Sequence, residues 1–178
     1  MSVPTQGLVL RTNRLVIRRF VQQDAKLLEP VFMDDYSQRF YPSINTPEAV
    51  EGWVAWNMKL YKEQGLGLCA VELASGGDFV GDAGLSYQTV EGERILEVGW
   101  HIHPAFRSRG YASEAGKAFR EYAFETFGVA CLGSVVDPTN EASIKVASRV
   151  HTECRSYQGK SGPMLLFYTV RSSGNIDA

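Results

Sequence analysis

The pattern of apolar and polar residues divides this chain into segments with two different periods. An apolar, β-branched run over 15–20 predicts a strand, and it closes an extended opening that begins at Leu8. Asp24 can then cap a helix over 25–33. The next segment, 34–45, mixes polar residues, aromatic residues and a proline, so we expect a loop there.

A second helix start follows this loop. Thr46 supplies a cap and Pro47 occupies the first helical position, after which apolar residues recur at helical spacing until Gly65. Three strand-like runs come next, separated by short turns rich in glycine and acidic residues, and strands joined in this way pair antiparallel. We therefore predict an antiparallel meander over 68–73, 79–88 and 95–103.

The last third of the chain alternates between helix and strand. It predicts a helix over 111–127, a strand over 131–136, a helix over 140–150 and a closing hairpin over 153–170. The last meander strand, the first of these helices and the following strand form one βαβ unit. We predict an α/β fold (α+β, with a mixed sheet) in a single domain over 1–178, with loose ends at 1–7 and 172–178.

Composition narrows the class of protein. The chain has 178 residues and a formal net charge of −2, which fits one domain and argues against a nucleic-acid partner held by a basic face. No apolar run reaches the roughly 18 residues that a membrane span needs, and the first residues do not resemble a signal peptide. We therefore expect a cytoplasmic protein without membrane contact. Cys69 and Cys131 lie in apolar strand runs and are expected to be buried free thiols.

A loop with two arginines joins the last meander strand to the helix over 111–127. Its sequence, Arg107-Ser108-Arg109-Gly110-Tyr111-Ala112, opens directly into that helix. The first N–H groups of a helix lack intrahelical partners and lie at the positive end of its dipole, so such a start favours an anion. Gly110 lets the backbone approach a ligand closely. The same six residues also fit a solvated turn.

The spacing R-x-x-G-x-A in this loop resembles the Q/R-x-x-G-x-G/A signature with which GNAT-superfamily N-acetyltransferases hold the pyrophosphate of acetyl-CoA. Four further segments resemble the same family in the same order, and the likeness is closest to the ribosomal-protein N-terminal acetyltransferase (RimJ/RimL-like) branch. They are Thr12–Arg18, Gly81–Leu85, Glu97–Phe106 and Asp137–Ala147. The resemblance implies a GNAT fold with a cleft between two diverging parallel strands, acetyl-CoA as co-substrate and an amine as acceptor.

The resemblance also implies which residues contact acetyl-CoA. The strand over 95–103 would carry a bulge, its end would bind the acetyl and pantetheine part, and one backbone N–H would face the thioester oxygen. The arginine loop would hold the pyrophosphate, and the helix over 140–150 would begin beside the sulfur. The residues expected to bind acetyl-CoA are Trp100, His101, Ile102, His103, Arg107, Ser108, Arg109, Gly110, Tyr111, Ala112, Ser113, Asn140 and Ser143.

Glu97 is the first candidate for a general base. Alternation along the strand places Leu96, Val98, Trp100 and Ile102 on a core face, and Ile95, Glu97, Gly99, His101 and His103 on a cleft face. An amine attacks only after its ammonium form loses a proton, which Glu97 or alternatively His101 would take. Glu97 could instead be a solvated carboxylate that pairs with Arg94. The two histidines lack a third ligand nearby, so we expect no metal.

Ser143 is the candidate that protonates the leaving thiolate. By the resemblance, many relatives use a tyrosine seven residues after the position of Asn140, and here that position is Ala147. In the alternative reading, the Ser143 hydroxyl bonds its own backbone and Asn140 only caps the helix. The chain also departs from the family at 150–153, where the usual helix end is missing, so the acceptor pocket could differ from that of relatives.

The first two helices and the loop between them are expected to recognise the acceptor. Their acidic and aromatic residues suit a cationic amine: Asp34, Asp35, Tyr36, Phe40, Tyr41, Trp53 and Trp56. An α-amino group, with a pKa of roughly 8 against roughly 10.4 for lysine, is easier to deprotonate. We expect an N-acetyltransferase for a protein N-terminus or a small amine, as a monomer or homodimer. The alternatives are a non-catalytic acyl-CoA-binding sensor or scaffold and a phosphate-binding protein of unrelated fold.

Overall fold

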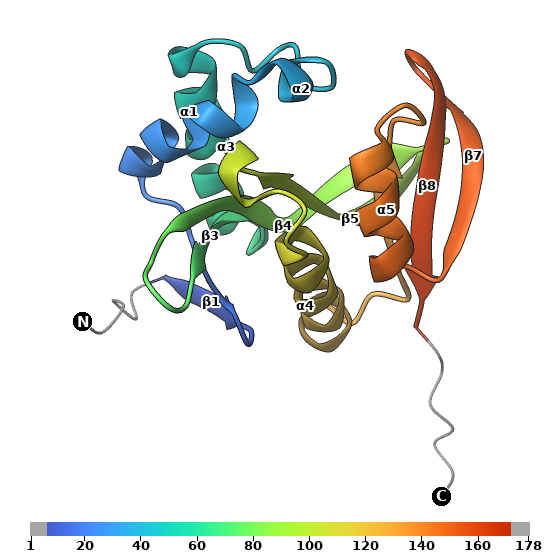
Figure 1. The fold of residues 1–178 in the computed structure, drawn as a ribbon. Coiled ribbons are helices and arrows are strands. Elements are labelled where there is room, and N and C mark those ends of the chain that lie inside the picture. The colour runs from blue at the N-terminus through green and yellow to red at the C-terminus, as the bar shows by residue number, and fades with distance from the viewer. Residues whose placement is uncertain (1–6, 172–178) are drawn as a thin grey trace, which may run out of the picture.

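The computed structural model describes residues 7–171, which form an eight-stranded mixed sheet flanked by helices (Figure 1). The strand order is β1-β2-β3-β4-β5-β6-β8-β7, and all neighbouring strands are antiparallel except β5 and β6. The predicted mixed α/β fold is therefore confirmed. The loose ends predicted at 1–7 and 172–178 fall outside the described residues, apart from Gly7.

The first third of the chain forms a hairpin and three helices. The extended opening is the hairpin of β1 (Leu8–Arg11) and β2 (Leu15–Arg18). The helix that follows Thr46 begins and ends as the sequence predicts. The Thr46 hydroxyl accepts the Ala49 N–H at 3.2 Å at its start, and Gly65 ends it with a left-handed φ of 73°. The helices are α1 (Ala25–Phe32), α2 (Asp35–Gln38) and α3 (Pro47–Gln64), with a 3-10 turn, η1 (Gln22–Asp24), before α1.

The predicted meander is present, but its third strand carries no bulge. It consists of β3 (Leu68–Leu73), β4 (Phe79–Val90) and β5 (Glu93–Ile102). The register between β4 and β5 is continuous from the pair Gly81 and Ile102 to the pair Val90 and Glu93. The bulge expected in β5 is therefore wrong for its pairing with β4. The sheet opens on the other side of β5, where β6 leaves it.

The predicted βαβ unit follows. It runs from β5 through the 3-10 turn η2 (Pro104–Phe106) and α4 (Tyr111–Thr126) to β6 (Cys131–Val136). β5 and β6 pair in parallel only at two positions, Leu96 with Leu132 and Glu97 with Gly133. The chain ends with α5 (Glu141–Val150) and the predicted hairpin of β7 (Glu153–Gly159) and β8 (Gly162–Val170), whose second strand pairs with β6.

Two apolar clusters cover the two faces of the sheet. Leu96, Val98 and Trp100 pack with Phe119 of α4 in the larger cluster, which confirms the predicted core face of β5. Phe32 of α1 belongs to the other cluster, formed with α3 and β3. Figure 1 shows α1, α2 and α3 grouped at one end of the meander, away from α4 and α5.

The cysteines differ in part from expectation. Cys69 is buried, but Cys131 and Cys154 are exposed, and all three are free thiols. Cys131 is exposed because it is the first residue of β6 and its cross-strand partner, Val170, is itself 59% exposed at the end of β8. Within residues 7–171, no helix has the length and apolar character that a membrane crossing requires.

Candidate active site

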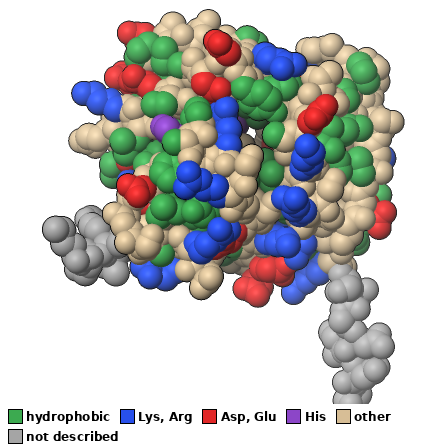
Figure 2. Space-filling model, in the orientation of Figure 1, with side chains coloured by type: hydrophobic (Ala, Val, Ile, Leu, Met, Phe, Trp, Pro, Cys, Tyr) green, Lys and Arg blue, Asp and Glu red, His purple; other side chains and the backbone are tan. Residues whose placement is uncertain are grey.

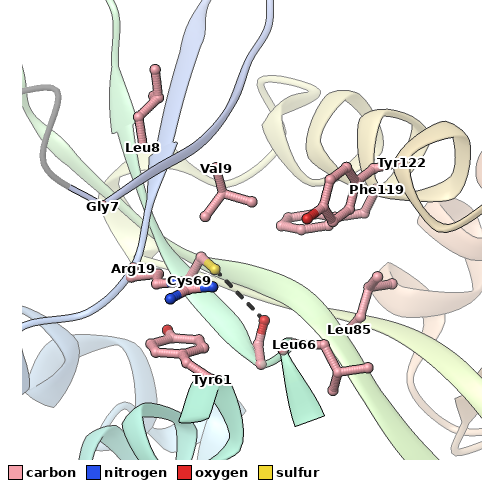
Figure 3. A pocket seen from close by; sticks show the side chains of 12 residues that line it. Gly7, Leu8, Val9, Arg19, Tyr61, Leu66, Cys69, Leu85, Phe119 and Tyr122 are labelled. Atoms are coloured by element: carbon pink, nitrogen blue, oxygen red, sulfur yellow. Dashed lines mark hydrogen bonds between the residues drawn. The ribbon is translucent and has the colours of Figure 1, made fainter. Parts of the chain in front are cut away.

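A cleft opens where β5 and β6 separate after their two paired positions. It has a volume of about 600 Å³ and is bounded by α2, the end of β5, the arginine loop, the start of α4 and one side of α5. This volume lies within the range of small-molecule and cofactor sites. A smaller hollow of about 280 Å³ lies elsewhere, beneath the β1–β2 hairpin beside Arg19, Tyr61 and Cys69 (Figure 3).

The structure brings most of the predicted acetyl-CoA-binding residues together around this cleft. Two lie apart from it: His103, whose Nδ1 accepts the Ala105 N–H at 3.1 Å, and the exposed Arg109, whose guanidinium lies over the Phe106 ring. Those that line the cleft are Trp100, His101, Ile102, Arg107, Ser108, Gly110, Tyr111, Ala112, Ser113, Asn140 and Ser143.

The start of α4 presents unpaired donors to the cleft. Gly110 is the N-cap with a φ of 83°, and the first helical N–H bonded back to it is that of Glu114, at 3.0 Å. The three preceding N–H groups therefore have no partner within the helix. The Ser113 hydroxyl is buried and has no hydrogen-bond partner among the described residues. A helix start with a left-handed glycine and an unpaired buried hydroxyl suits an anionic ligand.

Positive charge gathers at the same cleft. Figure 2 shows Lys and Arg side chains close to the hollow on this face of the molecule. Two of the cleft-lining cations, Lys145 and Arg149, lie on α5 and were not identified from the sequence. They lie four residues apart and so share one face of the helix, a signal that the sequence does contain.

The Arg107 side chain is hydrogen-bonded to other residues of the protein rather than free in the cleft. Its guanidinium donates to both carboxylate oxygens of Asp34, at 2.9 and 2.7 Å, and to the Ser37 hydroxyl at 3.0 Å. Its Nε donates to the Ile102 carbonyl at 3.1 Å. The same guanidinium holds the pKa of the Asp34 carboxyl well below its usual range. Arg107 thereby fastens α2 to the end of β5.

Asn140 connects α5 with α2. Its Oδ1 accepts the Ser143 N–H at 3.1 Å, which makes Asn140 the cap of α5, and also the Tyr36 hydroxyl at 2.7 Å. Asn140 is buried, so these two bonds satisfy an acceptor that water does not reach. The Ser143 side chain is half-buried at the cleft, and the structure gives its hydroxyl no bond within residues 7–171.

Glu97 lies at the point where the two parallel strands separate. The N–H of Val135, two residues beyond the last β6 pairing position, donates to its Oε1 at 2.8 Å. Burial raises the pKa of this carboxyl to about 7. The pairing with Arg94 weighed from the sequence does not form, since the Arg94 guanidinium lies 3.6 Å from the centre of the Tyr87 ring. Glu97 is half-buried and is not among the residues that line the cleft.

His101 has a buried partner that sequence analysis missed. Its Nδ1 lies 2.6 Å from Oδ1 of Asp82, its direct neighbour on β4, and the other Asp82 oxygen accepts the Trp53 indole N–H at 2.9 Å. The rings of Phe32 and Tyr41 lie 4.8 and 4.6 Å from the imidazole centre. Within residues 7–171, no three His, Cys, Asp or Glu side chains are arranged to hold a metal ion.

The unusual segment after α5 places a histidine in the interior. His151 is buried; its Nε2 lies 2.9 Å from the Ser134 hydroxyl, which donates to the Val98 carbonyl at 2.6 Å. Burial lowers the pKa of His151 to about 4. The segment 150–153 therefore connects the end of α5 to β6 and β5 rather than entering the cleft.

The chain is similar to known proteins in both sequence and structure. The family model described as an acetyltransferase (GNAT) domain matches residues 14–153. The chain is 30% identical over 142 residues to YkkB of Bacillus subtilis (strain 168), covering 79% of this chain and 83% of YkkB. An acetyltransferase structure from Agrobacterium tumefaciens str. C58 aligns with a TM-score of 0.76 at 26% identity, covering 96% of each chain.

A third comparison shows the fold alone. The structure of RimL, a ribosomal L7/L12 α-N-protein acetyltransferase in complex with coenzyme A, aligns with a TM-score of 0.73 at 12% identity. The alignment covers 94% of this chain and 99% of that one.

Proposed function

Because this chain belongs to the GNAT acetyltransferase family, we propose that it transfers the acetyl group of acetyl-CoA to a primary amine by direct attack. One observation carries the proposal. The cleft between β5 and β6 is closed at one end by the start of α4, whose first N–H groups and buried Ser113 hydroxyl have no protein partner among the described residues. A pyrophosphate supplies the acceptor oxygens that these donors lack.

The remaining walls fit the rest of acetyl-CoA. Ser108 and Gly110, which both line the cleft, have left-handed φ angles of 62° and 83°. Because the Arg107 guanidinium is bonded to Asp34, backbone N–H groups would carry the pyrophosphate contact, with Lys145 and Arg149 adding positive charge. Backbone groups from Trp100 to Ile102, which line the cleft, would border the acetyl and pantetheine part.

The reaction needs two proton movements besides formation of the C–N bond. The acceptor ammonium must lose a proton before its nitrogen attacks the thioester carbonyl, and the sulfur leaves as a thiolate that takes one up. Glu97, whose pKa is raised to about 7, and Ser143 at the start of α5 are the sequence candidates for these roles. A backbone N–H at the end of β5 would stabilise the oxyanion.

The acceptor is proposed to be a protein N-terminal α-amine or a small-molecule amine. Its side of the cleft is formed by α2 and the rings around His101, which offer an aromatic surface to a cationic group. The RimL neighbour acts on an α-amine of a ribosomal protein, which supports including peptide N-termini among the acceptors tested.

Two measurements test the proposal. A thermal shift with acetyl-CoA, compared with ATP and inorganic phosphate, should show stabilisation by acetyl-CoA well above that by the other two. Release of the CoA thiol is then followed with N-terminal peptides, polyamines and aminoglycosides. Stabilisation without thiol release from any acceptor would favour the acyl-CoA-binding sensor, and stabilisation by ATP alone would contradict acetyl-CoA as the ligand of this cleft.

A further inference from the structure

We propose that His101, held by Asp82, is the group that removes the proton from the acceptor amine, and that Glu97 instead fixes the separation of β5 and β6. The assignment rests on the proposed acetyl transfer. It names one catalytic residue, His101, which was the second candidate from the sequence, and one positioning residue, Asp82, which was not identified from the sequence.

The two candidate bases differ in their position relative to the cleft. His101 lines the cleft, whereas Glu97 does not. The Glu97 carboxylate is occupied by the Val135 N–H, in the place where the next bond of a β5–β6 ladder would otherwise form. A carboxylate used in this way holds two strand backbones apart. The paired part of β5 and β6 ends at Glu97, which is where the cleft begins.

Asp82 fixes the orientation of the His101 imidazole. Asp82 is fully buried, and its two oxygens accept from His101 Nδ1 and from the Trp53 indole. Because a carboxylate is only an acceptor, the Nδ1 of His101 carries the proton, and the lone pair of the neutral ring lies on Nε2. The structure gives Nε2 no hydrogen-bond partner within residues 7–171. This nitrogen is therefore available to an ammonium group in the cleft.

The surroundings of His101 suit the positive charge that forms when the ring takes up a proton. Phe32 of α1 and Trp53 of α3 pack against His101 and carry no charge, and Tyr41 presents a ring whose own ionisation is disfavoured by burial, with its pKa raised. The ionisable groups facing the imidazole are thus Asp82 on β4, Glu97 on its own strand and Tyr41. The buried Asp82 carboxylate compensates the imidazolium directly.

Acetyl transfer removes two protons from the amine nitrogen and adds one to the sulfur. Nε2 of His101 takes one proton from R–NH3+, and the free amine forms the C–N bond to the thioester carbonyl. The C–S bond breaks with its electron pair on sulfur, the attacking nitrogen loses its second proton, and the sulfur gains one. The net products are the acetamide, the CoA thiol and one proton, which His101 passes to solvent.

A matched pair of acceptors separates proton removal from every other role. Ethylamine is protonated near neutral pH, whereas 2,2,2-trifluoroethylamine is largely the free amine and needs no base for the first step. The His101→Gln variant should lower kcat/KM for ethylamine by about 10²- to 10³-fold, and for trifluoroethylamine by less than about tenfold. Asp82→Asn should show the same unequal loss, because the carboxylate that holds His101 Nδ1 is gone and the imidazole is no longer fixed in orientation. Equal losses for both amines would overturn the assignment.

The Glu97→Gln variant tests whether Glu97, rather than His101, is the base. If Glu97 is the base, its variant shows the unequal loss and His101→Gln does not, which would also overturn the proposal. Nitrogen NMR of the chain's three histidines gives a readout without turnover. His101 should hold its proton on Nδ1, and Asp82→Asn should mix the two tautomers; an unchanged tautomer would remove Asp82 from the role. Absence of thiol release by the unaltered enzyme with both amines and the wider acceptor panel would instead contradict the proposed function.

Discussion

Tyr36 donates a 2.7 Å hydrogen bond to Asn140 and so joins two walls of the cleft whose residues lie 104 positions apart in the chain. Asn140 belongs to the cap of α5, and Tyr36 belongs to α2. Together with the ion pair of Arg107 and Asp34, this bond fixes α2 over the cleft. The short helix α2 thereby becomes part of the binding site.

The Tyr36→Phe variant should bind acetyl-CoA about 3- to 10-fold more weakly, since a typical hydrogen bond contributes about 0.5–1.5 kcal/mol. The ring remains, so the packing against Phe40 is retained. Isothermal titration calorimetry measures the change. Tyr157→Phe, on the edge strand β7 away from the cleft, is the matched control and should bind as the unaltered protein does. Equal affinities for all three proteins would show that the Asn140 bond does not shape the site.

Gly110→Val should abolish measurable acetyl-CoA binding. The residue has a φ of 83°, where a β-branched side chain is strained, and its position at the start of α4 is where the pyrophosphate is proposed to lie. Gly92→Val is the matched control, because Gly92 has a φ of 87° in the β4–β5 turn, with nothing within 4 Å of an added Cβ. Both variants lose stability, but only the first should lose affinity. Retained affinity in a folded Gly110→Val protein would place the pyrophosphate elsewhere.

Local signals in the sequence predicted the elements, and these agree closely with the structure. The Thr46 cap, the left-handed Gly65 and the turns of the meander each act within a few residues, so short segments are sufficient to identify them. The resemblance placed the cleft between β5 and β6, as found. The helix α2 was missed because four residues are too few to show helical periodicity.

The side-chain partners inside the site could not be predicted in the same way. The Arg107 loop does border the cleft, but the ion pair of Arg107 with Asp34 spans 73 positions, and no local pattern contains both residues. The partner of His101 is different, because Asp82 faces it across a short hairpin whose register could be counted from the turn. That signal was present in the sequence. Whether Glu97 or His101 reaches the cleft depends on where β6 separates from β5. That separation is a property of the tertiary structure and has no local signal in the sequence.

Glu97 and His151 should give opposite contributions to the pH dependence of stability. Burial raises the pKa of Glu97 from 4.5 to about 7, so between these values the folded chain binds more protons and the free energy of unfolding falls as pH rises. Burial lowers the pKa of His151 from 6.5 to about 4, so over that interval the unfolded chain binds more protons and the free energy of unfolding rises with pH. In the unaltered protein the two trends offset each other.

Glu97→Gln removes the first trend and leaves the second. Its free energy of unfolding should rise with pH between 4.5 and 6.5 more steeply than that of the unaltered protein, the difference being at most about 3 kcal/mol at 1.36 kcal/mol per pKa unit. His151→Gln should show the reverse, a decline between 4.5 and 7. Urea unfolding at a series of pH values measures both. Parallel curves for the three proteins would mean that neither group titrates as its burial implies.

Ser143→Ala should reduce acetyl transfer by about 10- to 100-fold, within the lower part of the range for proton transfer by a side chain. Ala147 offers no proton, whereas the Ser143 hydroxyl lies at the cleft beside the Asn140 cap. A thiolate is already a fair leaving group near neutral pH, so the loss should be moderate and should appear in kcat more than in acetyl-CoA affinity. Ser148→Ala is the matched control, since the Ser148 hydroxyl donates to the Ile144 carbonyl of its own helix at 2.8 Å. If both variants keep full turnover, Ser143 is not the proton donor, and Tyr36, whose hydroxyl contacts the same Asn140, becomes the next donor to test.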